Sequence, residues 1–227
     1  MDDPNSMEST VSRLVQAALP HVPFDGWSTA ALTAAADDSQ TPPALARALF
    51  PRGGLDLALA YHRAGDQQLR DALAAMDLKS LRFRDRITSA VRLRLQSADR
   101  ECLRRSTALF ALPQHLAEGS RAVWATADTI WTALGDTSTD LNWYTKRASL
   151  SAVYGTTLLY WLGDDTPAQQ ATWAFLDRRI ENVMSFEKTK ASFRENPLGK
   201  ALLAGPLKVL ERVHAPNGTH HLPGKTP

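Results

Sequence analysis

The chain has 227 residues, of which 44% are hydrophobic and 22% are charged, and its formal net charge is +2. This composition is typical of an ordinary soluble globular protein, and so small a charge indicates no nucleic-acid or membrane partner by itself. The single cysteine, Cys102, excludes an internal disulfide and a thiolate metal cluster, and it fits a reducing compartment. No apolar stretch approaches the roughly 18 residues that span a bilayer.

Apolar residues recur at helical spacing along the chain, and no stretch shows the sustained alternation of a strand. The sequence therefore predicts an all-α protein. The expected helices for which both ends are defined lie at about residues 7–19, 42–50, 81–95, 114–134, 140–162 and 167–186. Another begins at about residue 28 and ends before a turn at 37–41, and three more begin at about residues 55, 100 and 198.

Residues 7–73 resemble the helix-turn-helix module of TetR-type proteins, in which a first helix braces a helix pair. The segment that would read DNA, PPALARALF at 42–50, has Arg47 as its one donor side chain. Direct readout needs several polar side chains at base edges, with phosphate contacts beside them. We therefore expect no nucleic-acid partner, and a TetR-type ligand-sensing transcriptional repressor is the alternative function.

A basic amphipathic pattern covers residues 81–95, where five arginines stand among apolar residues. They are Arg82, Arg84, Arg86, Arg92 and Arg94. Such a run is more often a solvated face paired with acidic residues than a nucleic-acid site, so we predict paired arginines here.

The stretch from Asp140 to Leu162, DLNWYTKRASLSAVYGTTLLYWL, combines a long helical pattern with many aromatic side chains. Its apolar residues form two adjoining stripes, and a narrow polar strip holds Asn142, Lys146 and Ser149. This apolar arc is about twice the roughly 100° that packing on one side requires, which predicts two buried sides. One side fits the core of its own domain, and the other fits a partner or a ligand.

The segment from Leu198 divides into an apolar half and a half that carries lysine, glutamate and arginine. This pattern is typical of a helix that lies in a membrane interface. The expected membrane-contact residues are Leu198, Leu202, Leu203, Leu207, Leu210 and Val213. A terminal helix docked on its own domain fits the pattern equally well. The Pro- and Gly-rich tail beyond Ala215 is expected to be disordered.

Sequence signals for catalysis are poor. The chain has no nucleophile elbow, P-loop, dinucleotide fingerprint, HExxH or Glu-x-x-His pair. Its histidines stand alone or lie in the tail, and a buried inert thiol is favoured for Cys102 over one whose pKa is lowered by neighbouring arginines. We therefore expect no enzymatic activity, no cofactor and no metal.

Several long motifs lie between residues 136 and 183. An Asp, then Asn-Trp-Tyr-Thr and two basic residues, stand at 140–147, and a Tyr-x-Thr-Thr segment stands at 154–157. An Asp-rich loop with proline follows at 164–167, and Trp-x-Phe-Leu-x-x-Arg-Ile at 173–180. This region resembles the signature region of the accessory lipid-binding protein family of ubiquinone (coenzyme Q) biosynthesis, the ninth protein of that pathway. The likeness extends more loosely over residues 7–213.

The resemblance implies a non-enzymatic lipid-binding protein with a TetR-like helical fold and a homodimer formed through its C-terminal helices. It also implies a pocket for isoprenoid quinone intermediates and a partnership with the di-iron demethoxyubiquinone hydroxylase. By motif match, the patch that contacts this enzyme would hold Asp140, Trp143, Tyr144 and Arg147, and the last helix would reach the bilayer. No mitochondrial presequence is recognised, which favours a bacterial member that is cytoplasmic and peripheral at the inner face of the membrane.

Periodicity alone suggests the lipid-binding residues Trp124, Trp131, Leu150, Tyr154 and Leu158, each of which also fits a core. The expected organisation is a degenerate helix-turn-helix module at 1–75, a lipid-binding and dimerisation domain at 76–190, a membrane-contact helix at 191–214 and a disordered tail at 215–227. The leading hypothesis is an accessory protein that presents an isoprenoid quinone precursor to its hydroxylase at the membrane.

Overall fold

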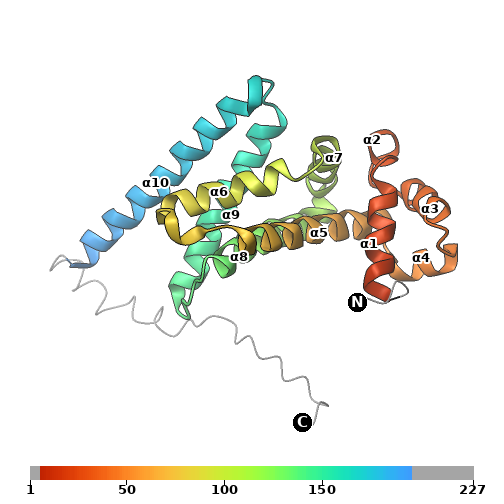
Figure 1. Ribbon diagram of the computed structural model, residues 1–227, viewed down its shortest axis with the longest axis horizontal. Helices are drawn as coiled ribbons and strands as arrows, with labels where there is room; N and C mark the ends of the chain where they lie inside the picture. Colours follow the sequence, from red (N-terminus) through yellow and green to blue (C-terminus); the bar gives the residue numbers. More distant parts are fainter. Residues whose placement is uncertain (1–5, 196–227) are drawn as a thin grey trace, which may run out of the picture.

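The computed structural model describes residues 6–195, and side chains as far as residue 185. Within that range the chain is helical and contains no strand, which confirms the predicted all-α fold (Figure 1). The helices are α1 (Met7–Ala18), α2 (Val22–Asp25), α3 (Thr29–Asp38), α4 (Pro43–Leu49), α5 (Gly54–Ala75), α6 (Phe83–Gln96), α7 (Arg100–Phe110), α8 (Leu116–Ala133), α9 (Leu141–Leu162) and α10 (Gln170–Glu195). The predicted membrane-contact residues, from Leu198 to Val213, and the predicted tail lie outside the described residues.

Polar caps fix the starts of several helices close to the expected positions. Side-chain oxygens of Ser28, Asp99 and Asp140 accept hydrogen bonds from backbone N–H groups in the first turns of α3, α7 and α9. Two elements differ from the expectation. The short helix α2 forms around Pro23, which the first turn of a helix tolerates because its missing N–H is not needed there. Helix α10 continues to Glu195 instead of ending near 186.

The N-terminal module comprises α1 to α4 and the first half of α5. Its core consists mainly of small and aliphatic side chains, which include Leu14, Val15, Ala18, Ala31, Leu32, Ala35 and Leu57. Trp27 connects this core to the rest of the chain, because its indole N–H donates to the carbonyl of Cys102 in α7 at 3.0 Å. The module is therefore attached by packing and by a buried hydrogen bond.

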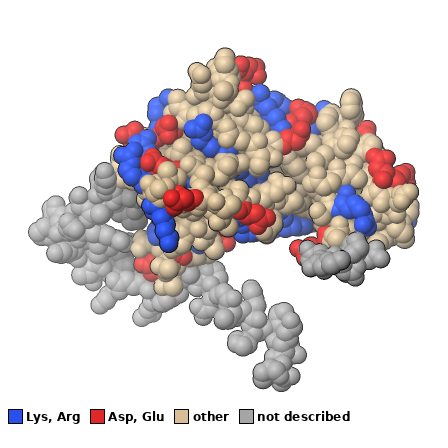
Figure 2. Space-filling view, in the orientation of Figure 1, with Lys and Arg blue, Asp and Glu red and all other residues tan. Residues whose placement is uncertain are grey.

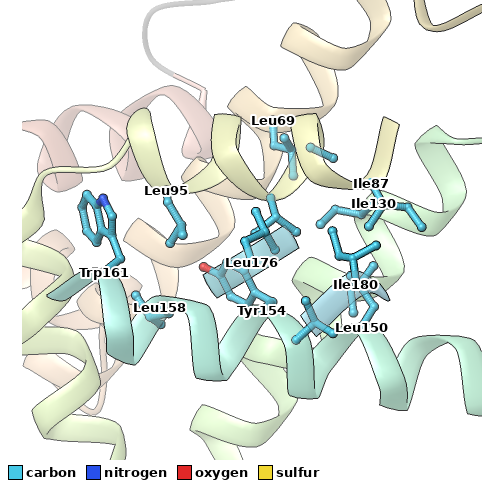
Figure 3. Close-up of a cluster of buried hydrophobic side chains, with 14 of the residues drawn as sticks. Leu69, Ile87, Leu95, Ile130, Leu150, Tyr154, Leu158, Trp161, Leu176 and Ile180 are labelled. Carbon is cyan, nitrogen blue, oxygen red and sulfur yellow. The ribbon is translucent and has the colours of Figure 1, made fainter. Parts of the chain in front are cut away.

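The C-terminal bundle comprises α6 to α10 and the second half of α5. Helices α8 and α9 form one antiparallel pair and α9 and α10 the next, so that α9 is packed from two sides (Figure 1). Figure 3 shows Tyr154 in the middle of this core, with Trp161 towards one end and Leu150, Ile87 and Ile180 towards the other. The core is thus continuous along most of α9.

Helix α5 belongs to both cores. Leu57 and Ala58 pack in the N-terminal module, whereas Leu69 and Leu73 pack in the C-terminal bundle. The expected division at residue 75 falls at the end of α5, whereas the second half of α5 already packs in the C-terminal bundle. The two cores are therefore joined through one uninterrupted helix.

Two of the five arginines at 82–94 pair with acidic residues as predicted, and the other three contact backbone carbonyls or an aromatic ring. Arg82 pairs with Asp85 on the surface, and Arg94 pairs with Asp66 in the interior. The guanidinium of Arg92 lies 4.7 Å from the centroid of the tryptophan ring of α10. On the face shown in Figure 2, basic and acidic side chains are interspersed. These pairings explain why the run is a packed and solvated face of the bundle.

Candidate functional site

The connection between α8 and α9 places charged side chains at the N-terminal end of α9. Gly135 follows α8 with a φ of +82°, a backbone conformation that other residues rarely adopt. Asp136 comes directly after it, and Asp140 then caps α9. This turn brings Asp136 beside Lys146 and Arg147, which lie in the second turn of α9.

Asp136 is the centre of this charged set. Its side chain is 2% exposed and accepts hydrogen bonds from Lys146 Nζ at 2.6 Å and from Arg147 Nη1 at 2.9 Å. Burial raises the pKa of Asp136, but hydrogen bonds from Lys146, Arg147 and Ser138 outweigh burial and lower that pKa to about 2. Arg147 also pairs with Asp128 of α8. The carboxylate of Asp136 is therefore ionised at neutral pH.

A cavity of about 690 Å³ opens beside this set, between α6, α8, α9 and α10. Its apolar wall is formed by Phe83, Ile87, Trp131, Leu134, Leu150, Val153, Ile180, Val183 and Met184. Its polar side chains are those of Asp136, Thr137, Ser138, Lys146 and Ser149. Small-molecule pockets have volumes of roughly 300–1,000 Å³ and mostly apolar walls with a few convergent polar groups. The cavity therefore has the size and the wall of a site for an amphiphilic molecule.

Lys146 connects the charged set to the aromatic wall of the cavity. Its Nζ donates to Ser138 Oγ at 2.6 Å and lies 5.1 Å from the ring centroid of Trp131. The indole N–H of Trp131 in turn donates to the carbonyl of Lys146 at 3.0 Å. The polar strip that the sequence placed at Lys146 and Ser149 therefore faces the cavity.

The expected lipid-binding residues separate into two groups. Trp131 and Leu150 line the cavity. Tyr154 and Leu158 instead lie further along α9 in the packed core, where they are 0% and 6% exposed, and Trp124 lies in a separate cluster of aromatic rings. Two of the five expected residues therefore line this cavity, because periodicity identifies a face of α9 and does not say how far along that face the helices separate.

Trp124, Trp143 and Tyr144 form what we call the aromatic cluster, on α8 and α9. The ring centroids of Trp143 and Tyr144 are 4.8 Å apart, and those of Trp124 and Trp143 are 5.9 Å apart. All three residues are partly exposed. The guanidinium of Arg147 lies 4.0 Å from the centroid of the Trp143 ring. The cluster is thus an aromatic surface supported by a buried cation.

Two of the residues expected in the partner patch, Arg147 and Asp140, make contacts that stabilise α9 and its surroundings. The side chain of Arg147 is 3% exposed, and its guanidinium bonds to Asp128, to Asp136 and to the carbonyl of Trp143. Asp140 accepts the backbone N–H of Asn142 at 3.0 Å and so caps α9. Arg147 is therefore buried beneath the aromatic cluster, and its place in a partner patch stays a prediction.

A second buried network of charges, which the sequence analysis did not find, joins α5, α6 and α8. Arg94 Nε and Thr126 Oγ1 each donate to Asp66 Oδ1 at 2.8 Å, and His62 Nε2 lies 2.9 Å from Thr126 Oγ1. Burial, and then the positive charge of Arg94, lower the pKa of His62 to about 4. A Cβ added at Gly65 would lie 2.7 Å from Arg94 Cζ, so glycine leaves room for the guanidinium. The i,i+4 spacing of His62 and Asp66 was the available sequence signal.

The Asp-rich loop of the sequence motif caps α10. Asp164 accepts hydrogen bonds from the backbone N–H and the hydroxyl of both Thr166 and Thr172. Hydrogen bonds from Thr166, and then from Thr172, hold the pKa of Asp164 well below its usual range. This loop therefore fixes the start of the helix that forms one wall of the cavity.

Reactive chemistry is scarce in the part of the chain that the structure describes. Burial, followed by a hydrogen bond with Asp99, raises the pKa of Cys102 to about 12, and the thiol is buried as expected. Among these residues no group of three His, Cys, Asp or Glu side chains is placed to hold a metal ion. None of the described helices has the length and apolarity needed to cross a membrane.

Comparison with known proteins decides the family. A family model described as COQ9 matches residues 116–187, which include α8, α9 and the described side chains of α10. The mitochondrial ubiquinone biosynthesis protein COQ9 of Rattus norvegicus is 31% identical over 215 residues, which cover 90% of this chain and 67% of the rat protein. The chain belongs to the COQ9 family. The Homo sapiens COQ9 protein is 30% identical over 215 residues, which cover 90% of this chain and 66% of the human protein.

The chain thus spans about two thirds of the length of these COQ9 relatives, which are named as mitochondrial proteins of ubiquinone biosynthesis. A solved TetR transcriptional regulator from Nitrosomonas europaea is similar in structure, with a TM-score of 0.62 and 16% identity over 76% of this chain and 97% of the regulator. This similarity confirms the predicted TetR-like fold. The COQ9 match includes the whole aromatic cluster and every member of the charged set around Asp136.

Proposed function

We propose that this COQ9-family chain is a non-enzymatic lipid-binding accessory protein of ubiquinone biosynthesis, which holds an isoprenoid quinone intermediate in the cavity between α6, α8, α9 and α10. The cavity carries the proposal, because its volume of about 690 Å³ and its apolar wall suit a hydrocarbon tail. Burial contributes roughly 0.8 kcal/mol for each CH₂ group, so an isoprenoid tail gains most of its affinity there. The polar end at Asp136 and Lys146 suits an oxygenated head.

The groups beside the cavity support binding more than catalysis. Asp136 and Lys146 are engaged in an ion pair with each other, and Ser138 is bonded to both. His62 and Cys102 are buried outside the cavity lining. A general base works best when its pKa lies near the operating pH, and the pKa of Asp136, which accepts the Ser138 hydroxyl, is about 2. The proposed role is therefore to hold and present a lipid to an enzyme.

Titration with a benzoquinone that carries a three-isoprene tail tests this function. In Val183→Trp an indole enters the cavity, and we expect the affinity for the quinone to fall at least ten-fold because the tail loses its volume. Leu112→Trp is the matched control, since Leu112 is 42% exposed and lies outside the lining. Equal affinity of the two variants and of the unmodified chain would contradict the proposal.

The aromatic cluster is the surface that we assign to the demethoxyubiquinone hydroxylase. Trp143 and Tyr144 are partly exposed in the first turn of α9, one turn before the cavity residue Lys146. Tryptophan and tyrosine often contribute most of the binding energy in protein interfaces. Trp143→Ala should weaken binding to the purified hydroxylase by about 2 kcal/mol or more. Phe24→Ala, in the N-terminal module and 85% exposed, should leave binding unchanged.

Isothermal titration of both variants, together with their circular dichroism, separates binding from folding. A loss of helicity in Trp143→Ala without a separate binding defect would return Trp143 to the core, which is its alternative role.

A homodimer through α9 and α10 is a further part of the proposal. Leu159 and Tyr160 are 61% and 41% exposed, and Tyr160 stacks on Phe175 of α10 with ring centroids 4.7 Å apart. These residues give the outer side of the helix pair an apolar surface. Leu159→Glu should convert the dimer to a monomer in sedimentation velocity, and a monomeric unmodified chain would remove this part of the proposal.

Peripheral contact with the membrane is proposed for the segment 198–213, which lies outside the described residues. Flotation of the full chain with anionic vesicles tests it. Leu202→Glu with Leu210→Glu should reduce the bound fraction, because each charge replaces an apolar contact residue. Unchanged flotation would favour the alternative that this segment docks on its own domain.

The alternative function of a TetR-type repressor has no comparable support. Helix α4, at the position of the recognition helix, buries Ala46 and exposes Leu45 and Arg47. One arginine is insufficient for direct readout of several bases. We therefore propose no nucleic-acid partner, and a salt-dependent gel shift with upstream DNA at low salt would contradict this.

A further inference from the structure

The polar end of the cavity selects between lipids that share an isoprenoid tail. We infer that Lys146 anchors a neutral oxygen of the ligand head, a quinone carbonyl or a phenolic hydroxyl, and that the site disfavours phosphorylated heads. This inference rests on the proposed function, since it requires that the cavity holds the tail. It adds a head-group site and a residue that determines specificity.

The described partners of Lys146 take two of its three N–H donors. An ammonium group carries three N–H donors. Two of them reach Asp136 Oδ1 and Ser138 Oγ, each at 2.6 Å. No hydrogen bond within the described residues takes the third, and the side chain is 36% exposed where it lines the cavity. The ammonium is therefore positioned to donate to a ligand while it keeps both protein partners.

Aromatic side chains beside Lys146 provide a surface for a flat ring. The ring centroids of Trp131 and Phe83 are 5.6 Å apart, and both residues line the cavity. Offset or tilted contacts between aromatic rings are favourable beyond the burial of their area. A planar quinone or phenol ring that packs on these side chains brings a ring oxygen towards Lys146 Nζ, which lies 5.1 Å from the Trp131 centroid.

The balance of charges argues against a phosphorylated head. Lys146 and Arg147 are already paired with the carboxylates of Asp128 and Asp136. A phosphate at Lys146 Nζ would lie close to the ionised Asp136, with both cations of the set already neutralised, and the two anions would repel each other. A neutral oxygen adds no charge and accepts a hydrogen bond from a charged donor, which is stronger than one between neutral groups.

Two probes with the same farnesyl tail test the inference on the full chain by isothermal titration. One is a farnesylated benzoquinone and the other is farnesyl diphosphate. We expect the quinone to bind at least ten-fold more tightly than the diphosphate. Lys146→Met should weaken quinone binding by about ten-fold, which corresponds to the loss of one hydrogen bond from a charged donor. Lys79→Met is the matched control, because Lys79 is exposed and lies outside the lining.

A second variant keeps the test decisive if Lys146→Met perturbs folding. Lys146→Gln retains an N–H donor without the charge, so its quinone affinity should lie between those of the unmodified chain and Lys146→Met. Unchanged quinone affinity in both variants would overturn the inference, as would a diphosphate that binds as tightly as the quinone.

Val183→Trp distinguishes failure of the inference from failure of the proposed function. Val183→Trp could abolish quinone binding while the Lys146 variants leave it unchanged. In that case the cavity holds the tail, but Lys146 does not bind the head group. If none of the variants changes quinone binding, both the inference and the proposed function fail.

Discussion

Two sets of charged residues in the C-terminal bundle differ in whether their donors face the protein interior or a cavity. The closed network consists of His62, Asp66, Arg94 and Thr126. The open set consists of Asp128, Asp136, Lys146 and Arg147. Arg94 is 1% exposed and its guanidinium bonds to protein groups, whereas Lys146 is 36% exposed and faces a cavity. A fully buried ion pair can therefore hold helices together, whereas a partly exposed one such as Lys146 with Asp136 can also offer a donor to a ligand.

The largest expected effect comes from opening the closed network. In Arg94→Met the carboxylate of Asp66 stays buried without its cation, and we expect the free energy of unfolding to fall by about 3–5 kcal/mol. Urea denaturation measures this loss. Arg82→Met is the control, because the pair of Arg82 with Asp85 is exposed and should contribute less than about 1 kcal/mol. A similar loss in both variants would contradict the distinction between buried and surface pairs.

The sequence predicted the helices that carry both sets of charges, but it did not predict which side chains contact each other. Helix α9 begins and ends within a residue of the expectation, because the cap at Asp140 and the apolar stripes are local signals. His62 was interpreted as an isolated histidine, since its partner Thr126 lies 64 residues away. The aromatic motif was found, but the burial of Arg147 depends on acids of α8 and of the connecting loop that only the fold brings together.

The position of the cavity was equally beyond local signals. Val183 and Ile180 of α10 face Phe83 and Ile87 of α6 across it, and these residues are about one hundred positions apart in the chain. Periodicity identified Leu150 on the correct face of α9, but it identified Tyr154 on the same face with equal weight. The spacing between helices, which separates a cavity wall from a packed core, is a property of the tertiary structure.

Acid should weaken the closed network before the open set. The pKa of His62 is about 4 in the folded chain, below its ordinary value of 6.5, so the unfolded chain binds the proton more readily. The free energy of unfolding should therefore fall as the pH decreases from about 6.5 to 4, by up to roughly 3 kcal/mol. The pKa of Asp136 is about 2, below its ordinary value of 3.8, so its contribution should be lost between about pH 4 and 2.

Urea denaturation across this pH range, repeated with His62→Gln, assigns the two phases. The variant keeps an N–H donor for Thr126 but does not titrate, so the loss between pH 6.5 and 4 should disappear and the loss below pH 4 should stay. A first phase that persists in His62→Gln would show that other groups cause it.

The smallest expected effect on stability comes from the open set. Lys146→Met removes a partly exposed cation, and Arg147 still neutralises Asp136, so the free energy of unfolding should change by less than about 1 kcal/mol. The affinity for a quinone should fall in the same variant. A loss of stability as large as that of Arg94→Met would show that both sets are structural and would remove the contrast between them.

Photo-crosslinking is the most direct test of the claim that the cavity holds an isoprenoid tail. The full chain would be irradiated with a benzoquinone that carries a diazirine at the end of a farnesyl tail, and the labelled residues would be identified by mass spectrometry. We expect labelling of cavity residues such as Ile180, Val183 and Met184. Labelling confined to the exposed outer residues Leu159 and Tyr160 would contradict it.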